Sequence, residues 1–284
     1  ASSLFHFRFG QENWNANKEH PPVAKYIYSA ASVFEMRQDG ENYTGGRIAS
    51  AAMLSITIAL VFLFAAELFT FTTGLFASVF LMLTPPFIGF GRVLGMDSPT
   101  TLVFLLIAIA FYRFAKSEAR ARDYVWPVVI FALGIATRYN IVLSAIFLPV
   151  AIVLFAKWRT DYKKWVSLIV FPLGAVLIFY LIWPYLWSDP IGAMKLSVGH
   201  WGQVREWFLG VKDAILPSSY FLIYFIYSVP IAVMLFALIG LIFKPWNNKK
   251  LYILVLMLVP FINSFIGIKQ GGVTYVRRIV KTGG

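Results

Sequence analysis

Long apolar segments separated by short polar connections run along most of the chain. A helix of about 20 apolar residues crosses the hydrocarbon core of a bilayer, and somewhat shorter segments cross when flanking polar side chains reach the headgroups. Eight segments fit this description: residues 48–66, 72–90, 99–112, 124–137, 140–156, 165–182, 220–243 and 251–268. The pattern predicts an all-α polytopic membrane protein with about eight transmembrane helices.

The connections between these segments alternate in charge. Three are short and basic, and they contain Lys116, Arg120 and Arg122; Lys157, Arg159, Lys163 and Lys164; and Lys244, Lys249 and Lys250. Short loops rich in Lys and Arg face the cytoplasm, so the other connections are predicted to lie outside. The alternation holds through all eight segments, which independently supports their number.

This topology predicts five regions. They are an outer loop over residues 1–47, a six-helix membrane bundle over 48–183, an outer loop over 184–219, two further transmembrane helices within 220–268 and an outer tail over 269–284. The first residues lack the charge and apolar pattern of a signal peptide. We therefore expect at least one further helix before Ala1, in a longer protein.

Two outer segments carry apolar residues at helical spacing. The first stripe follows Pro21 and Pro22, which suit the start of a helix, and contains Val23, Ile27, Ala30 and Phe34. The second contains Met194, Val198, Trp201, Val204 and Phe208. Both are predicted to be amphipathic helices at the level of the headgroups, or helices that cover the outer end of the bundle.

Composition agrees with a membrane protein. The chain is 59% hydrophobic and 13% charged, with a mean hydropathy of +0.72, which exceeds what a soluble domain of 284 residues buries. The net charge of +12 suits anionic headgroups, so no nucleic-acid partner is expected. The chain has no Cys and its three His residues form no HExxH pair, so we expect neither a metal site nor another cofactor.

Ionisable residues gather at the predicted outer boundary of the membrane: Glu19, His20, Lys25, Arg47, Arg92, Asp97, Arg138, Lys269, Arg277 and Arg278. Any one of them taken alone is explained as a snorkelling anchor or a solvated loop charge. Positive charge on the outer face runs against the usual bias, however. A ring of cations with one or two carboxylates would bind a lipid phosphate and accept a proton from an incoming hydroxyl.

Several stretches resemble motifs of one family. The stretch "EHPPVAKY" resembles the first-outer-loop signature of polyprenyl-phosphate-dependent glycosyltransferases of the C-type membrane fold, especially protein O-mannosyltransferases and aminoarabinose transferases. Further stretches match in the same order: "GRIASAAM", "GRVLGMDSPT", "GIATRYN", "WPYLWSDP" and "KQGGVTYV". The resemblance covers nearly the whole chain and implies a C-type glycosyltransferase-like fold.

The resemblance also implies roles for individual residues. Glu19 would be the catalytic carboxylate, and Asp97 a second functional acid. The donor phosphate would be bound by His20, Lys25, Arg92, Arg138 and Arg277. Asp97 has an alternative explanation, because Asp followed by Ser-Pro is also typical of a helix N-cap.

The implied reaction transfers a mannose-like hexose from a polyprenyl phosphate to an acceptor hydroxyl with inversion, on the outer face of a membrane. The implied partners are the lipid-linked sugar, the bilayer and an acceptor protein, lipid or polysaccharide. A prokaryotic plasma membrane is favoured over the endoplasmic reticulum.

Two other functions stay open. The family carries an acidic motif upstream of His-Pro-Pro, where this chain has only Gln11-Glu12. Either the matching acid lies before Ala1, or the chain is a non-catalytic subunit of a membrane complex. A transporter or lipid flippase is a further alternative, although such proteins commonly show internal repeats and charges at mid-membrane, and neither is evident here.

Overall fold

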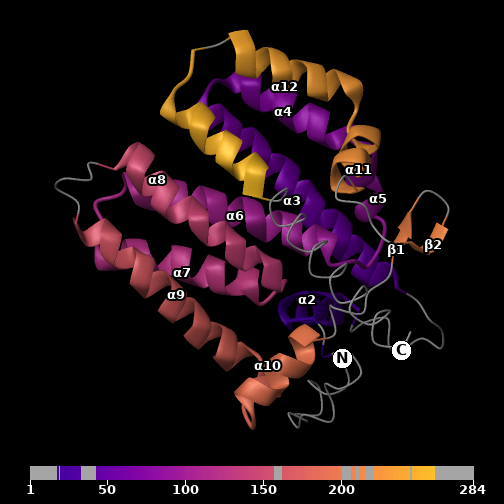
Figure 1. Ribbon diagram of the computed structural model, residues 1–284, viewed down its shortest axis with the longest axis vertical. Helices are drawn as coiled ribbons and strands as arrows, with labels where there is room; N and C mark the ends of the chain where they lie inside the picture. The colour runs from indigo at the N-terminus through magenta and orange to yellow at the C-terminus, as the bar shows by residue number, and fades with distance from the viewer. Residues whose placement is uncertain are drawn as a thin grey trace, which may run out of the picture.

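The computed structural model describes residues 18, 20–32, 43–156, 162–199, 206–208, 211–214, 220–243 and 245–259. The described part is a bundle of helices with one short hairpin (Figure 1). Its helices are α2 (Val23–Ala31), α3 (Thr44–Leu68), α4 (Phe71–Met82), α5 (Pro85–Phe90), α6 (Asp97–Lys116), α7 (Ala121–Ile135), η2 (Tyr139–Ile146), α8 (Phe147–Phe155), α9 (Tyr162–Ile182), η3 (Pro184–Leu186), α10 (Pro190–Gly199), α11 (Tyr220–Ser228) and α12 (Ile231–Phe243). Residues 248–259 are also helical.

Among the described residues, three helices are long and apolar enough to cross a membrane: α3, α6 and α9. A fourth crossing is obtained when α11 and α12, which meet at an angle of 110°, are taken as one broken span. Shorter apolar helices cover residues 71–82 and 139–155. The described residues therefore form a helical bundle of the membrane type with three or four candidate spans. The predicted number of eight spans is not confirmed.

Two of the predicted apolar segments are interrupted at proline. Segment 72–90 divides into α4 and α5, with Pro85 in the first position of α5. That position suits proline, because its missing N–H would have no partner there anyway. Segment 220–243 bends after Val229, where Pro230 precedes α12. Segment 140–156 begins as the 3-10 helix η2 before it continues as α8.

Of the two predicted outer helices, the first is present and the second is shorter than predicted. The first is confirmed as α2, with Pro22 directly before it, but its buried residue is Ala24 rather than a member of the predicted stripe. The second begins as α10 and ends at Gly199. Its extension to Phe208 is wrong, because β1 (Glu206–Phe208) pairs with β2 (Val211–Ala214) in an antiparallel hairpin. Phe34, Trp201 and Val204 lie outside the described residues.

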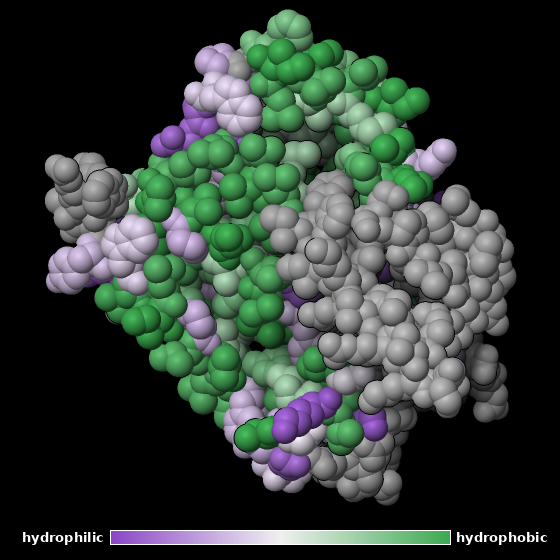
Figure 2. Space-filling view, viewed as in Figure 1, coloured by the Kyte–Doolittle hydropathy of each residue, from purple (hydrophilic) through white to green (hydrophobic). Residues whose placement is uncertain are grey.

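The core is built around α6. More than half of the apolar part of α6 is buried, against less than a third of α3 and of α9. The ring of Phe111 packs on Phe131 of α7 and Phe171 of α9, with centroid distances of 5.7 and 5.8 Å. The outward faces of α3 and α9 expose large apolar side chains, and hydrophobic residues dominate the coloured surface in Figure 2. Such faces suit contact with lipid.

Helices α3 and α4 approach closely at Gly74. A Cβ atom at this position would lie 2.5 Å from the carbonyl oxygen of Phe62 and 3.0 Å from the Cβ of Ala66. The first of these is a backbone atom, so a side chain rotation cannot relieve the contact. Gly240 in α12 offers a matched comparison, because a Cβ there would meet nothing within 4 Å.

We predict that Gly74→Ala destabilises the protein by about 1–3 kcal/mol, because the added methyl forces α3 and α4 apart. Gly240→Ala is expected to be neutral or to stabilise by up to about 1 kcal/mol through helix propensity. Thermal unfolding of both variants in detergent measures the difference. Equal unfolding temperatures for the two variants would contradict the close approach.

Candidate functional site

Helix α2 is hydrogen-bonded to one end of the bundle, where α6 begins and where α7 and α9 end. This is the end that the charges of the connections predict to lie outside. The backbone N–H of Val23 donates to the carbonyl of Ala136 at 2.9 Å. The Tyr26 hydroxyl donates to the carbonyl of Ile182 at 2.8 Å. These bonds fix α2 directly after the Glu-His-Pro-Pro motif.

The opposite face of α2 joins a small network of hydroxyl groups. The Tyr28 hydroxyl donates to the carbonyl of Gly95 at 2.7 Å and lies 3.4 Å from Oγ of Ser50. The hydroxyls of Ser50 and Ser98 lie 2.7 Å apart, and both serine side chains are fully buried. Burial raises the pKa of Tyr28, and the nearby charge of Asp97 adds to this increase. The Tyr28 hydroxyl therefore stays protonated and neutral beside Asp97.

Asp97 and Arg138 form an ion pair at the same end. Arg138 Nη1 donates to Asp97 Oδ1 at 3.2 Å, and the side chains are 30% and 44% exposed, respectively. The alternative in which Asp97 is an N-cap is wrong: Met96 occupies the N-cap position, and Asp97 is the first residue of α6. The carboxylate instead binds the guanidinium across 41 positions of sequence.

The Glu-His-Pro-Pro segment is anchored on both sides of Glu19. Ser197 Oγ of α10 donates to the carbonyl of Lys18. Lys25 Nζ donates to the carbonyl of His20 at 2.6 Å. Glu19 itself lies outside the described residues, as does Arg277. Lys25, predicted to bind phosphate, holds the motif in place through this bond.

Of the predicted site residues that are described, Arg92 stands apart. Its side chain is exposed, and within the described part of the chain no ion pair involves it. The other described residues are His20, Lys25, Asp97 and Arg138. They belong to α2 and the residues before it, to the start of α6 and to the turn after α7. Helix α2 is hydrogen-bonded close to both of the other two positions, at Gly95 and at Ala136. In the same part of the chain, no group of three or more His, Asp and Glu side chains has a geometry that would hold a metal ion.

Several polar residues at this end of the bundle were not predicted to belong to the site. The Tyr139 hydroxyl lies 2.5 Å from Oγ of Ser197, the side chain that donates to the carbonyl of Lys18. Burial raises the pKa of Tyr139 as well. Tyr26, Tyr28, Ser50 and Ser98 are the other polar members. A hydroxyl inside an apolar helix, such as Ser50, was the available signal, but small hydroxyl residues are common in membrane helices.

These features define a polytopic, integral membrane protein with a polar, charged site at one end of its bundle. Residues 19–187 match the family described as dolichyl-phosphate-mannose-protein mannosyltransferase, and the chain belongs to that family. The predicted resemblance to polyprenyl-phosphate glycosyltransferases is confirmed at this level.

One curated relative is an undecaprenyl phosphate-alpha-4-amino-4-deoxy-L-arabinose arabinosyl transferase from Pseudomonas savastanoi pv. phaseolicola (strain 1448A / Race 6). It is 33% identical over 123 residues, which is 41% of this chain and 21% of the relative. The chain thus matches about a fifth of that protein's length. No solved structure gave a significant match.

The anchoring of α2 predicts an alkaline transition. Burial raises the pKa of Tyr26 from 10.0 to about 12, so the folded protein favours the neutral phenol. The stability that this side chain contributes is complete below about pH 10 and is lost as the pH rises toward 12. We expect the tyrosinate absorbance of the wild type minus that of Tyr26→Phe to rise with a midpoint near 12. A midpoint near 10, the value of a solvated phenol, would contradict this burial.

Proposed function

We propose that this protein is a membrane glycosyltransferase that transfers a mannose-like hexose from a polyprenyl phosphate to an acceptor hydroxyl, with inversion at the anomeric carbon. The family membership supports a lipid-linked sugar donor. The observation that carries the proposal is the half-exposed Asp97–Arg138 pair, which lies at the end of the bundle where the residues on both sides of Glu19 are anchored.

The reaction needs few groups. An acceptor hydroxyl attacks the anomeric carbon as the bond to the phosphate oxygen breaks, and Glu19 takes the hydroxyl proton as a general base. Negative charge grows on the departing lipid phosphate, where Arg138 and His20 would stabilise it, together with Arg92 and Arg277. Arg138 contacts Asp97 through one nitrogen, and a guanidinium has five N–H donors. It therefore has donors left for a phosphate while Asp97 holds its orientation.

The same proposal includes the topology. Eight crossings would place this site on the outer face, with the basic connections on the cytoplasmic side. A lipid donor would then enter laterally between helices, with its phosphate at the interface. Glycosylation of the Asn42-Tyr43-Thr44 sequon in a eukaryotic host would report on the side of the membrane that this loop occupies.

We predict that Glu19→Gln lowers transfer of radiolabelled sugar from a polyprenyl-phosphate donor by orders of magnitude, because the amide cannot accept the proton. The assay uses purified full-length protein in detergent. Glu118→Gln, a change of the same kind in an exposed ion pair of a basic connection, is the matched control and should transfer normally. Near-normal transfer by Glu19→Gln would exclude Glu19 as the base. Absence of both transfer and donor binding in the wild type would favour a non-catalytic subunit.

We predict that Arg138→Gln lowers transfer about 100-fold, as the loss of one donor to a developing oxyanion does. Its effect on stability should be only about 0.2–1 kcal/mol, because a half-exposed ion pair contributes little. Transfer rates and unfolding temperatures, measured beside the control Arg120→Gln, separate these effects. If Arg138→Gln unfolds the protein but the surviving fraction transfers normally, the pair is structural.

A further inference from the structure

A second polar region lies at the opposite end of the bundle. There, a groove of about 560 Å³ lies between α3, α6 and α7, a size within the range of small-molecule sites. Its walls are apolar and include Leu60, Leu63, Phe64 and Ile109. Two arginines, Arg113 and Arg122, line it where α6 ends and α7 begins.

The two arginines retain donors for a ligand. The side chain of Arg113 is 65% exposed and is bonded to Glu67 through Nη2 alone, at 3.0 Å. The side chain of Arg122 is 76% exposed, and its Nε lies 3.9 Å from Asp123 Oδ1, which is too long for a hydrogen bond. Both guanidinium groups can therefore donate to an anion at the mouth of the groove.

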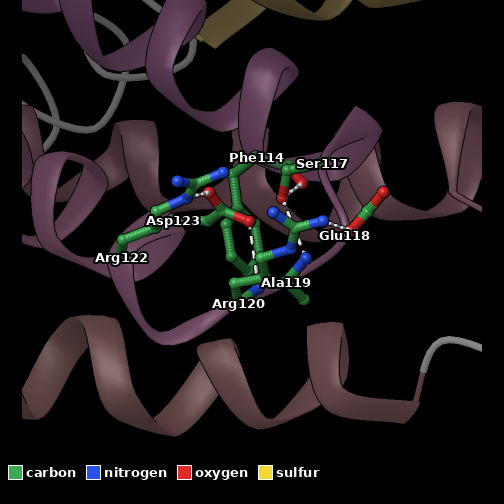
Figure 3. A network of polar contacts seen from close by, with 7 residues as sticks. All are labelled: Phe114, Ser117, Glu118, Ala119, Arg120, Arg122 and Asp123. Carbon is green, nitrogen blue, oxygen red and sulfur yellow. Dashed lines mark hydrogen bonds and ion pairs between the residues drawn. The ribbon is translucent and has the colours of Figure 1, made fainter.

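Glu118 and Asp123, the acidic side chains of this connection, already have partners, and Asp123 also lines the groove (Figure 3). Asp123 Oδ2 accepts from the backbone N–H of Arg120 at 2.9 Å and caps α7, while Glu118 pairs with Arg120. From residue 113 to 123, and with Glu67 included, four basic residues oppose three acidic ones: Arg113, Lys116, Arg120 and Arg122 against Glu67, Glu118 and Asp123. These residues sum to +1, and the buried Lys164, which donates to the carbonyl of Ala115, adds a further positive charge, so the region suits an anionic ligand.

The surroundings of the groove are those of a membrane boundary. Trp126 lines the groove and is 70% exposed, and Leu63 beside it is also exposed. Tryptophan favours the level of the headgroups, where its apolar ring and polar N–H are both satisfied. The groove thus opens onto an apolar surface at the expected boundary of the membrane, where a lipid can enter it.

We propose that this groove binds one anionic phospholipid of the leaflet opposite the transfer site. One acyl chain lies along Leu60, Phe64 and Ile109, and the phosphate accepts hydrogen bonds from Arg113 and Arg122. Because α3, α6 and α7 meet here, the bound lipid holds together the ends of three helices. This site is separate from the proposed donor site and does not depend on the transfer activity.

Quenching of Trp126 tests the proposal. Full-length protein in neutral detergent is titrated with phosphatidylglycerol brominated in its acyl chains, and Trp126→Phe, titrated in parallel, isolates the signal of Trp126 from the other eight tryptophans. We expect saturable quenching of Trp126 by this lipid, at least about fivefold tighter than by brominated phosphatidylcholine, since one charge near a surface contributes about 1 kcal/mol. Added salt should weaken the binding of the anionic lipid.

The double variant Arg113→Gln/Arg122→Gln should bind phosphatidylglycerol at least about tenfold more weakly, because hydrogen bonds between charged groups are lost. Arg120→Gln is the matched control, since Arg120 belongs to the same connection but faces Glu118 and does not line the groove. Equal binding of the two lipids by the wild type, or unchanged binding by the double variant, would overturn the proposal. Absence of saturable quenching would overturn it too, and would leave a helix of another protein as the occupant to test.

Discussion

The arrangement of the end of the bundle that binds α2 depends on backbone groups that a helix cannot satisfy by itself. The last carbonyls of a helix and its first N–H groups have no partners within the helix. Here, the Val23 N–H at the start of α2 meets the Ala136 carbonyl at the end of α7, and the Tyr26 hydroxyl meets the Ile182 carbonyl that ends α9. The short helix α2 thereby provides hydrogen-bond donors for carbonyls at the ends of α7 and α9. A buried carbonyl without such a donor would cost free energy.

At the opposite end of the bundle, a charged side chain donates a hydrogen bond to a carbonyl near the end of a helix. Lys164 at the start of α9 is buried, and its Nζ donates to the carbonyl of Ala115 in the last turn of α6 at 2.8 Å. A cation suits this position because the C-terminus of a helix carries partial negative charge. The basic residues of this connection are therefore not all equivalent: Lys164 is part of the packing, whereas Arg113 and Arg122 remain at the surface.

Hydrophobic length predicted most of the helices, because burial of apolar segments in lipid is a property of local sequence. The interruptions were harder to predict. Pro127 and Pro172 lie inside α7 and α9, whereas Pro85 is the first residue of α5 and Pro230 directly precedes α12. Proline is tolerated inside a helix or divides it according to whether its surroundings compensate for the lost hydrogen bond, which a single segment does not reveal. The hairpin at residues 206–214 was missed because an apolar stripe at helical spacing is also compatible with two short strands around a turn.

The candidate site was predictable as a set of charges but not as a set of contacts. Asp97 and Arg138 were each singled out, yet their pairing depends on how α6 meets the turn after α7. Ser50 and Ser98 could not be assigned to the site from the sequence, because a small hydroxyl residue in a helix ordinarily bonds to its own backbone. They became part of the site only through Tyr28, which belongs to a third element.

The anchoring of α2 also imposes an order on biosynthesis. The partners of Val23 and Tyr26 lie 113 and 156 residues further along the chain, so α2 cannot dock until Ile182 has been synthesised and α9 has formed. Chains are made from the N-terminus at about 5–20 residues per second, which leaves the Glu-His-Pro-Pro segment undocked for about 8–30 seconds while the later helices are synthesised. The Glu-His-Pro-Pro motif is therefore synthesised well before its partners, and the polar site is completed only after α7 and α9 are in place.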